Sequence, residues 1–110
     1  METLRATSTW SPTADRYCLW AEDVAGSSFV PEPIQSDPLA ALLLEVDEAE
    51  QETGRIAGFE IIGFLTFDHW ESLPKLDVLW QLPGREPLPL DQLLKRVQKE
   101  LRRRKVQEAA

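Results

Sequence analysis

The 110-residue sequence contains one cysteine, one histidine and five glycines, and each scarcity disfavours a class of function. A lone Cys18 cannot form a disulfide within the chain, which favours a reducing compartment. Nucleophilic catalysis at Cys18 would need a base, and His69 is the only imidazole. The glycines stand singly at positions 26, 54, 58, 63 and 84, so no glycine-rich phosphate loop is present. An enzyme is therefore not the expected class.

A metal site is not indicated either. His69 lies in the segment Asp68-His69-Trp70-Glu71, where consecutive residues of a helix would not face one another. A metal site needs three or four converging ligands, so we expect a surface histidine. No metal, cofactor or small-molecule substrate is evident. A small hydrolase stays open as a third alternative, provided that Glu60, Asp68, His69 or Glu71 converge in one pocket.

Long apolar segments are missing as well. The longest aliphatic run, residues 39–44, is about a third of the length that crosses a membrane. Residues 1–5 lack the apolar core of a signal peptide. We therefore expect a cytoplasmic protein that does not enter a membrane.

Charge is divided unevenly along the chain. Residues 1–89 hold sixteen acidic and five basic residues, a net charge of −11, whereas residues 90–110 carry +4, within a total of −7. The acidic body disfavours broad nucleic-acid binding, and the basic end favours pairing with that body, within or between chains. The length fits a single domain, with residues 1–89 as an acidic β-rich body and residues 90–110 as a basic C-terminal helix.

Alternating apolar residues and turn signals predict a β-rich body, in which residues 5–11 and 15–21 form an antiparallel hairpin across a turn at residues 12–14. Periodicity alone leaves residues 39–46 as helix or strand, but an acidic, glycine-ended turn at 47–54 and a strand-like segment after it favour a hairpin. The prolines of residues 22–38 predict a loop, with an extended run against the sheet as the alternative. Apolar residues 64, 65, 67 and 70 are spaced like one face of a short helix over 64–72. Strands are predicted at the following ranges: 5–11, 15–21, 39–46, 55–62 and 77–82.

The last segment carries the clearest pattern, which predicts a helix from about residue 90 to residue 105. Asp91 lies near its N-terminal end and basic residues lie near its C-terminal end, where each charge favours the helix dipole. One apolar stripe follows the spacing i, i+3, i+4, i+7 and i+11: Leu90, Leu93, Leu94, Val97 and Leu101. We predict an α+β fold in which an antiparallel sheet of four to five strands carries this helix on one face.

Two stretches resemble the small DUF2283 family. Residues 10–20, WSPTADRYCLW, are similar to its opening pattern, aromatic-Asp-Pro-x-x-Asp-x-Leu-Tyr-Ile, with Ser11 in place of the usual first Asp. Residues 44–62, LEVDEAEQETGRIAGFEII, resemble its second half, in which a strand, an acidic turn and a Gly-x-Glu-aliphatic strand follow one another. The resemblance covers residues 9–63 and implies a small β-rich fold of uncharacterised function, with no catalytic residues to transfer.

Four tryptophans, at positions 10, 20, 70 and 80, are an excess for this length. Core packing is their expected role, with Trp10 and Trp20 as a cross-strand pair, and an exposed dimer or ligand surface is the alternative. The first functional hypothesis is a non-enzymatic interaction or assembly module, a homodimer or a subunit of a complex. The second is regulatory or nucleic-acid binding through the basic helix. The candidate partner-binding residues are Trp10, Trp20, Leu90, Leu94, Val97, Leu101, Arg102, Arg103, Arg104 and Lys105.

Overall fold

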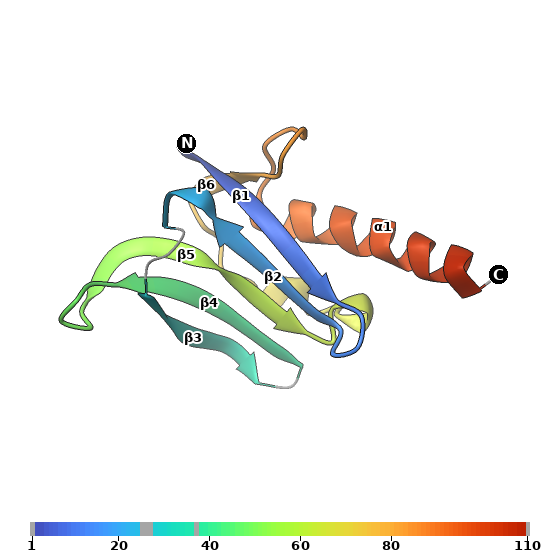
Figure 1. Ribbon diagram of the computed structural model, residues 1–110, viewed down its shortest axis with the longest axis horizontal. Coiled ribbons are helices and arrows are strands. Elements are labelled where there is room, and N and C mark those ends of the chain that lie inside the picture. The colour runs from blue at the N-terminus through green and yellow to red at the C-terminus, as the bar shows by residue number, and fades with distance from the viewer. Residues whose placement is uncertain (1, 25–27, 37, 110) are drawn as a thin grey trace.

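The computed structural model describes residues 2–24, 28–36 and 38–109, in which six strands form one mixed β-sheet with a single α-helix behind it (Figure 1). The predicted α+β class is confirmed. The strands are β1 (Glu2–Ser11), β2 (Arg16–Ala21), β3 (Ser28–Ser36), β4 (Leu39–Val46), β5 (Glu52–Ile62) and β6 (Val78–Gln81). Their order across the sheet is β3-β4-β5-β2-β1-β6. The helices are α1 (Leu90–Ala109) and the short 3-10 turns η1 (Glu22–Val24), η2 (Phe64–Thr66) and η3 (Trp70–Ser72).

Both predicted hairpins are present. β1 and β2 pair antiparallel across the turn at residues 12–15, and β4 and β5 pair antiparallel across the acidic turn. Residues 39–46 are therefore a strand. The register between β1 and β2 sets Trp10 opposite Tyr17 and Trp20 opposite Thr7. Because neighbouring positions alternate between the two faces of a strand, Trp10 and Trp20 lie on opposite faces, and the predicted cross-strand pair is wrong.

The loop predicted over residues 22–38 contains the edge strand β3; positions 25–27 and 37 lie outside the described residues. β3 pairs with β4 alone and forms the outer edge of the sheet. Proline is tolerated at such an edge, because its missing N–H costs no ladder bond when that position faces outward. Pro31 and Pro33 therefore restrict this segment to the edge without preventing a strand.

The all-antiparallel sheet of four to five strands is also corrected, because β6 runs parallel to β1. Residues 63–77 carry the chain from β5 past β2 to the far side of β1, where β6 enters in the direction of β1. β1 is long enough for two neighbours: residues 2–5 pair with β6 and residues 6–11 pair with β2. The alternation of apolar and polar residues predicts a strand, but it does not predict which other strand it pairs with.

The single helix predicted over residues 64–72 is two separate 3-10 turns, η2 and η3. Phe67, which follows η2, has extended backbone angles, so the first turn ends there. The side-chain amide of Gln98 on α1 donates hydrogen bonds to the carbonyl oxygens of Phe64 and Phe67 at 2.7 and 2.8 Å. These carbonyls are thus satisfied by α1, and a continuing helix is not needed to satisfy them.

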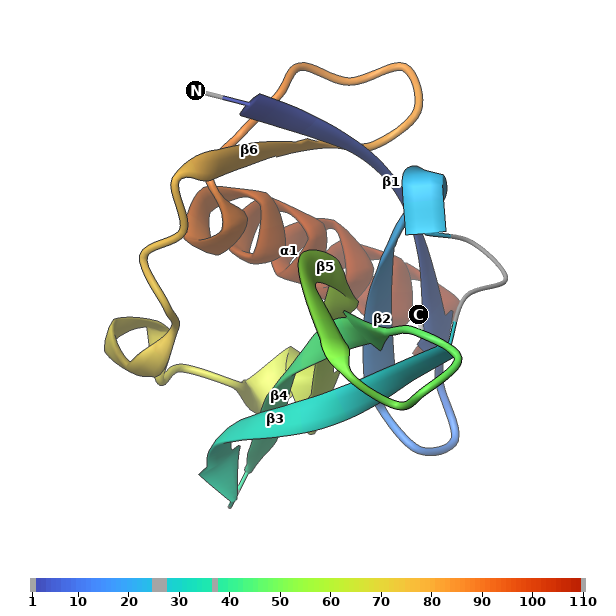
Figure 2. The same ribbon diagram turned by 90° about the vertical axis from the view of Figure 1, so that its left-hand side faces the viewer.

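The apolar stripe of α1 packs against the sheet, as predicted, and forms the core with residues of β2, β5 and β6. In Figure 2, β3 runs across the view whereas β1 and β2 run steeply up it, so the sheet is strongly twisted. Tyr17 stacks on Phe64, with ring centroids 4.4 Å apart. The largest fully buried side chains are those of Trp80, Tyr17, Phe59, Phe64, Phe67, Leu19, Leu43, Ile61 and Leu94.

Candidate interaction surface

The face of the sheet opposite α1, here called the outer face, carries the residues that alternate with the core positions. On β2 these are Arg16, Cys18 and Trp20, because Tyr17 and Leu19 point into the core. Their partners across β5 are Ile62, Glu60 and Gly58, in that order. Beyond β5 the same face continues through Ala41 and Leu43 on β4 to Phe29, Pro31 and Pro33 on β3.

The outer face exposes large apolar side chains. Phe29 is 43% exposed and Ile62 is 39% exposed. The ring of Phe29 meets that of Trp20, with centroids 5.2 Å apart, across the two intervening strands β4 and β5. Val30, which is 37% exposed, has the same chemistry but lies on the other face of β3. Trp20 and Phe29 thus form one apolar contact on this face, and Ile62 lies further along it, next to the Arg16–Glu60 pair.

Both outermost strands of the sheet are protected against pairing with another strand. Pro31 and Pro33 remove two backbone donors from β3, at one edge. At the other edge, the backbone N–H groups of Trp80 and Leu88 donate to each other's carbonyl oxygens at 2.7 and 2.9 Å. The segment after β6 thus folds back along its free edge. A partner at these two strands would therefore meet the sheet on a face and not along a strand edge.

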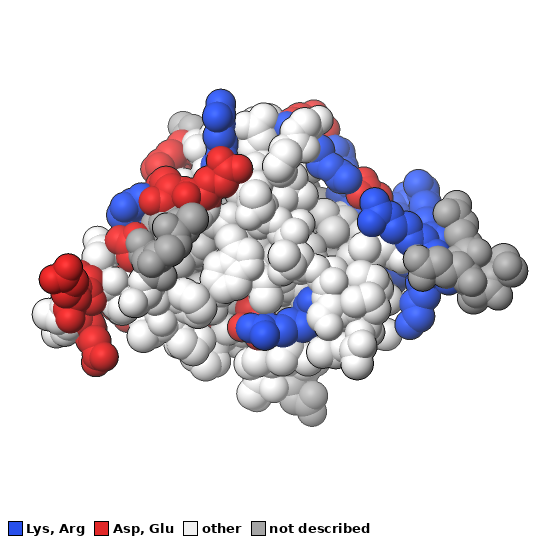
Figure 3. Space-filling view, in the orientation of Figure 1, with Lys and Arg blue, Asp and Glu red and all other residues white. Residues whose placement is uncertain are grey.

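Charge is segregated along the long axis of the molecule, which measures 50 × 30 × 27 Å. Figure 3 shows the outer face largely free of charged atoms, with acidic groups at the end that holds the β4–β5 turn and basic groups at the end of α1. The acidic end includes the exposed side chains of Asp47, Glu48, Glu50 and Glu52. The basic end includes the exposed side chains of Arg102, Arg103, Arg104 and Lys105.

Within the outer face, Glu60 is neutralised by Arg16. The Arg16 Nε lies 2.7 Å from the Glu60 carboxylate, across the neighbouring strands β2 and β5. Cys18, directly opposite Glu60, is buried. Burial raises the pKa of the Cys18 thiol, and the Arg16 guanidinium offsets part of that rise. The thiol form is therefore favoured, and this group is a poor nucleophile.

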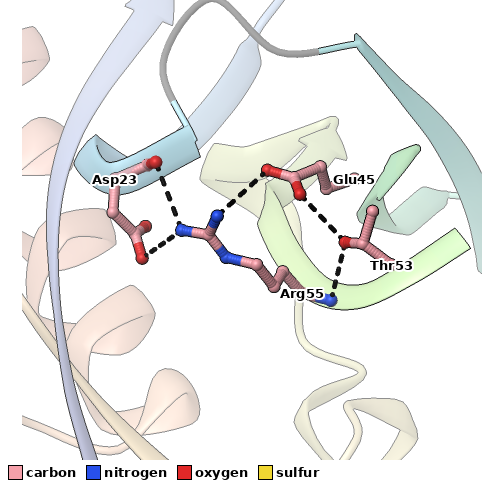
Figure 4. Close-up of polar contacts among 4 residues, drawn as sticks. All are labelled: Asp23, Glu45, Thr53 and Arg55. Atoms are coloured by element: carbon pink, nitrogen blue, oxygen red, sulfur yellow. Dashed lines mark hydrogen bonds and ion pairs between the residues drawn. The ribbon is translucent and has the colours of Figure 1, made fainter. Parts of the chain in front are cut away.

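A second polar cluster joins three parts of the sheet at its acidic end (Figure 4). The Arg55 guanidinium donates to the carboxylate and the carbonyl oxygen of Asp23 at 2.7 and 3.2 Å, and its other terminal nitrogen lies 3.6 Å from Glu45. The buried Glu45 accepts a hydrogen bond from Thr53 at 2.9 Å. Arg55 thus links η1 to β4 and β5 through these contacts, so the cluster is structural.

Trp10 lies on the α1 side of the sheet, where its indole N–H donates to the Asp15 carboxylate at 2.9 Å. The same carboxylate accepts from the backbone N–H of Leu65 at 3.0 Å. The carbonyl oxygen of Asp15 accepts from the N–H groups of Gly63 and Phe64 at 2.9 and 3.1 Å. Asp15 adopts a left-handed φ of 49°. It therefore locks the β1–β2 turn onto the segment that begins η2.

Most of the helix residues predicted to bind a partner serve the fold. Leu90, Leu94, Val97 and Leu101 are buried in the core of the same chain and present no surface to a partner. The Arg102 guanidinium donates to the carbonyl oxygen of Leu65 at 2.7 Å. The exposed basic side chains beyond it are Arg103, Arg104 and Lys105. Of the predicted set, Trp20 alone lies on the outer face.

The residues of the hydrolase hypothesis do not converge in one pocket. Glu60 is paired on the outer face, whereas Asp68 is an exposed side chain that reaches His69 at 3.4 Å. Across the described part of the chain, no three His, Cys, Asp or Glu side chains are grouped so as to hold a metal ion. Within the same residues, no helix has the length and apolar character to span a membrane.

The fold and surface define a small α+β protein with one uncovered sheet face. Comparisons with protein-family models, with curated proteins and with solved structures find no match. The resemblance of residues 9–63 to the DUF2283 family therefore stays a prediction.

Sequence reasoning missed Phe29 and Ile62. Phe29 stands in a segment whose prolines predicted a loop. Ile62 ends a strand in which both faces are apolar, so alternation there could not distinguish the covered face from the open one.

Proposed function

We propose that the protein is a non-enzymatic assembly module that forms a homodimer through its outer face. The observation that carries this proposal is the exposure of Phe29 and Ile62, with Trp20 against Phe29, on the sheet face opposite α1. Uncovered apolar surface of this kind is typical of association sites. Because both outermost strands of the sheet, β3 and β6, are protected, we expect association through this face.

The charge pattern favours a second copy as the partner. If a two-fold axis runs across the long axis of the molecule, the outer faces meet with the two copies antiparallel. The acidic β4–β5 turn of each copy then lies toward the basic end of α1 in the other. A standard interface of this kind buries roughly 800 Å² on each partner.

The test is the mass of the purified protein in solution by light scattering, at low and high salt and micromolar concentrations. We expect a dimer at both salt concentrations, because apolar contacts carry the interface, with weaker dimerisation at high salt as the end-to-end attraction is screened. A monomer under both conditions would refute the proposal.

Two substitutions locate the interface. Ile62→Glu and Phe29→Glu each place a charge in the apolar surface and should give monomers that retain the wild-type circular dichroism. Val30→Glu is the matched control, because Val30 has similar exposure on the opposite face of the same strand, and it should remain dimeric. A dimer that survives Ile62→Glu, or that is lost only in Val30→Glu, would place the interface elsewhere.

Nucleic-acid binding through α1 is a second candidate, supported by seven exposed basic side chains on that helix: Lys95, Arg96, Lys99, Arg102, Arg103, Arg104 and Lys105. Arg96 is paired with Glu86 at 2.8 Å and Lys95 lies over the Trp70 ring, which lowers the number available to phosphates. Retardation of DNA or RNA that weakens with salt and disappears when residues 102–105 are replaced by Gln would support it. Retardation unaffected by that replacement would exclude this helix.

A further inference from the structure

Residues 6–11 of β1 have a neighbouring strand on one side only. They pair with β2, whereas β6 pairs with residues 2–5, and β1 runs on well past the end of β6 (Figure 1). The sheet order sets β1 between β2 and β6, so the open side is the side on which β6 lies. Among the described residues, no backbone segment bonds residues 6–11 on that side. β1 therefore has an open edge, at which every second residue directs its N–H and C=O away from β2.

A pocket of about 280 Å³ lies at this edge, with α1 as its other wall. On the β1 side it is lined by three consecutive residues, Ser8, Thr9 and Trp10. Consecutive residues of a strand point to opposite faces, so a pocket on one face of the sheet would be lined by alternate residues only. The pocket therefore opens at the edge of the strand. Leu82, directly after β6, also lines it, so the pocket continues the line of β6.

The wall formed by α1 is one face of the helix, because its residues follow the spacing i, i+3, i+4 and i+7: Val97, Glu100, Leu101 and Arg104. Glu100 is already engaged by Arg85, with both N–O distances at 2.8 Å, so this pair leaves no free charge in the wall. A strand edge thus faces a helix across a groove with apolar side chains. Extended peptides add to sheets at such edges, where backbone hydrogen bonds hold them and alternate side chains pack in the groove.

We propose that residues 6–11 of β1 bind an extended segment of a partner protein as an additional strand, between β1 and α1 and in line with β6. Six residues at about 3.4 Å each make an edge of roughly 20 Å, enough for a segment of about six residues. Every second side chain of that segment points toward the same face as Trp10, so apolar residues fit there. This edge is separate from the outer face, so the proposal does not depend on the homodimer.

Charge favours a different protein over a second copy at this edge. The C-terminal end of α1 exposes Arg103, Arg104 and Lys105, and Arg104 lines the groove. A second copy that paired through the same edge would bring its own basic helix end beside this one, and the like charges would repel. A partner segment flanked by acidic residues would be attracted to the same end. The expected partner segment is therefore extended, apolar at alternate positions and acidic at one end.

Amide hydrogen exchange of the full chain, followed by nuclear magnetic resonance, tests the open edge without any ligand. Within residues 6–11, the amides bonded to β2 should exchange slowly, and the alternate amides that face the groove should exchange on the order of tenfold faster or more. Equally slow exchange of all these amides would show that the edge is covered and would overturn the proposal.

Random peptides of about seven residues displayed on phage are the probe for the partner segment, selected on the full chain and on the bare support in parallel. The selected peptides should show the predicted pattern, and one of them, added as a synthetic peptide, should slow the fast amides of residues 6–11. A selection without enriched peptides, or a bound peptide that leaves these amides fast, overturns the proposal. Slowing of the same amides by raised protein concentration alone would assign the edge to a second copy and also overturn it.

A proline variant separates backbone pairing from side-chain contacts. Neighbouring residues direct their amides to opposite sides, so either Ser8 or Thr9 has the fast, groove-facing amide. Ser8→Pro or Thr9→Pro, at that position, removes a donor from the groove but no bond to β2. The variant should keep the wild-type circular dichroism and bind the selected peptide on the order of tenfold more weakly. The alanine variant at the same position keeps the N–H and should bind like wild type. A proline variant that binds as tightly as the alanine variant would overturn the proposal.

Discussion

The substitution Gly58→Ala tests the central packing of the sheet. Gly58 lies on β5, between β4 and β2, and is paired with Trp20. A Cβ atom at this position would lie 2.1 Å from the carbonyl oxygen of Leu19 and 3.2 Å from its carbonyl carbon. Both are backbone atoms of β2, so no side-chain rotation can relieve the contact. The two strands would have to separate by roughly 1 Å to reach an ordinary packing distance.

The expected cost follows from that separation. Forcing one extra carbon into a packed interior costs about 1–3 kcal/mol, and one or two weakened ladder hydrogen bonds between β2 and β5 add about 1 kcal/mol each. We expect Gly58→Ala to lower the free energy of unfolding by about 2–5 kcal/mol, a large share of the roughly 5–15 kcal/mol typical of a domain. The sign is informative, because replacing glycine by alanine in an unstrained, uncrowded position stabilises a protein by about 0.4–1 kcal/mol.

Urea unfolding followed by tryptophan fluorescence measures this difference. Gly54→Ala is the comparison, because Gly54 has open space around it and a φ of 84°, so its cost of about 1–2 kcal/mol comes from the backbone alone. Gly58→Ala should be the more damaging of the two. A Gly58→Ala protein as stable as wild type would show that β2 and β5 do not approach as closely as described, and the position of Trp20 on the outer face would lose its support.

Three further predictions concern the α1 side of the molecule. Asp15→Ala should lower the unfolding free energy by about 2–4 kcal/mol, because it removes a carboxylate that accepts two hydrogen bonds and places alanine at a left-handed φ. Asp15→Asn should cost less, because asparagine tolerates that φ. Equal costs of the two variants in urea unfolding would contradict this. Gln98→Ala should cost about 1–3 kcal/mol in the same assay, because the Phe67 carbonyl oxygen loses the amide and the Phe64 carbonyl oxygen keeps only the Phe67 N–H, and a neutral effect would show that water replaces the amide. Tyr17 is the only tyrosine, so its phenolate absorbance can be titrated directly. Because burial raises its pKa from 10.0 to about 12, the free energy of unfolding should be unaffected by this group below pH 10 and should fall as the pH rises from 10 toward 12. Tyr17→Phe should remove that fall. A phenol that titrates near pH 10 in the folded protein would refute the prediction.

The sequence alone determined the elements whose signals are local. The stripe from Leu90 to Leu101 predicted α1 and its buried face, because a helix with one apolar stripe must cover it against another layer. The turns at residues 12–14 and 47–54 predicted two hairpins, because antiparallel strands close in sequence pair across such turns.

Only the tertiary structure decided which strands become neighbours and which faces stay open. Nothing in residues 78–81 indicates that they lie parallel to β1, because that pairing depends on the path of residues 63–77 around the sheet. The prolines of β3 are compatible with a strand only because that strand is at an edge. The outer face collects residues distant in sequence, because the fold sets β2, β5, β4 and β3 side by side. Alternation assigns each side chain to one of the two faces of the sheet, but long-range packing decides which face is covered by the helix and which stays open.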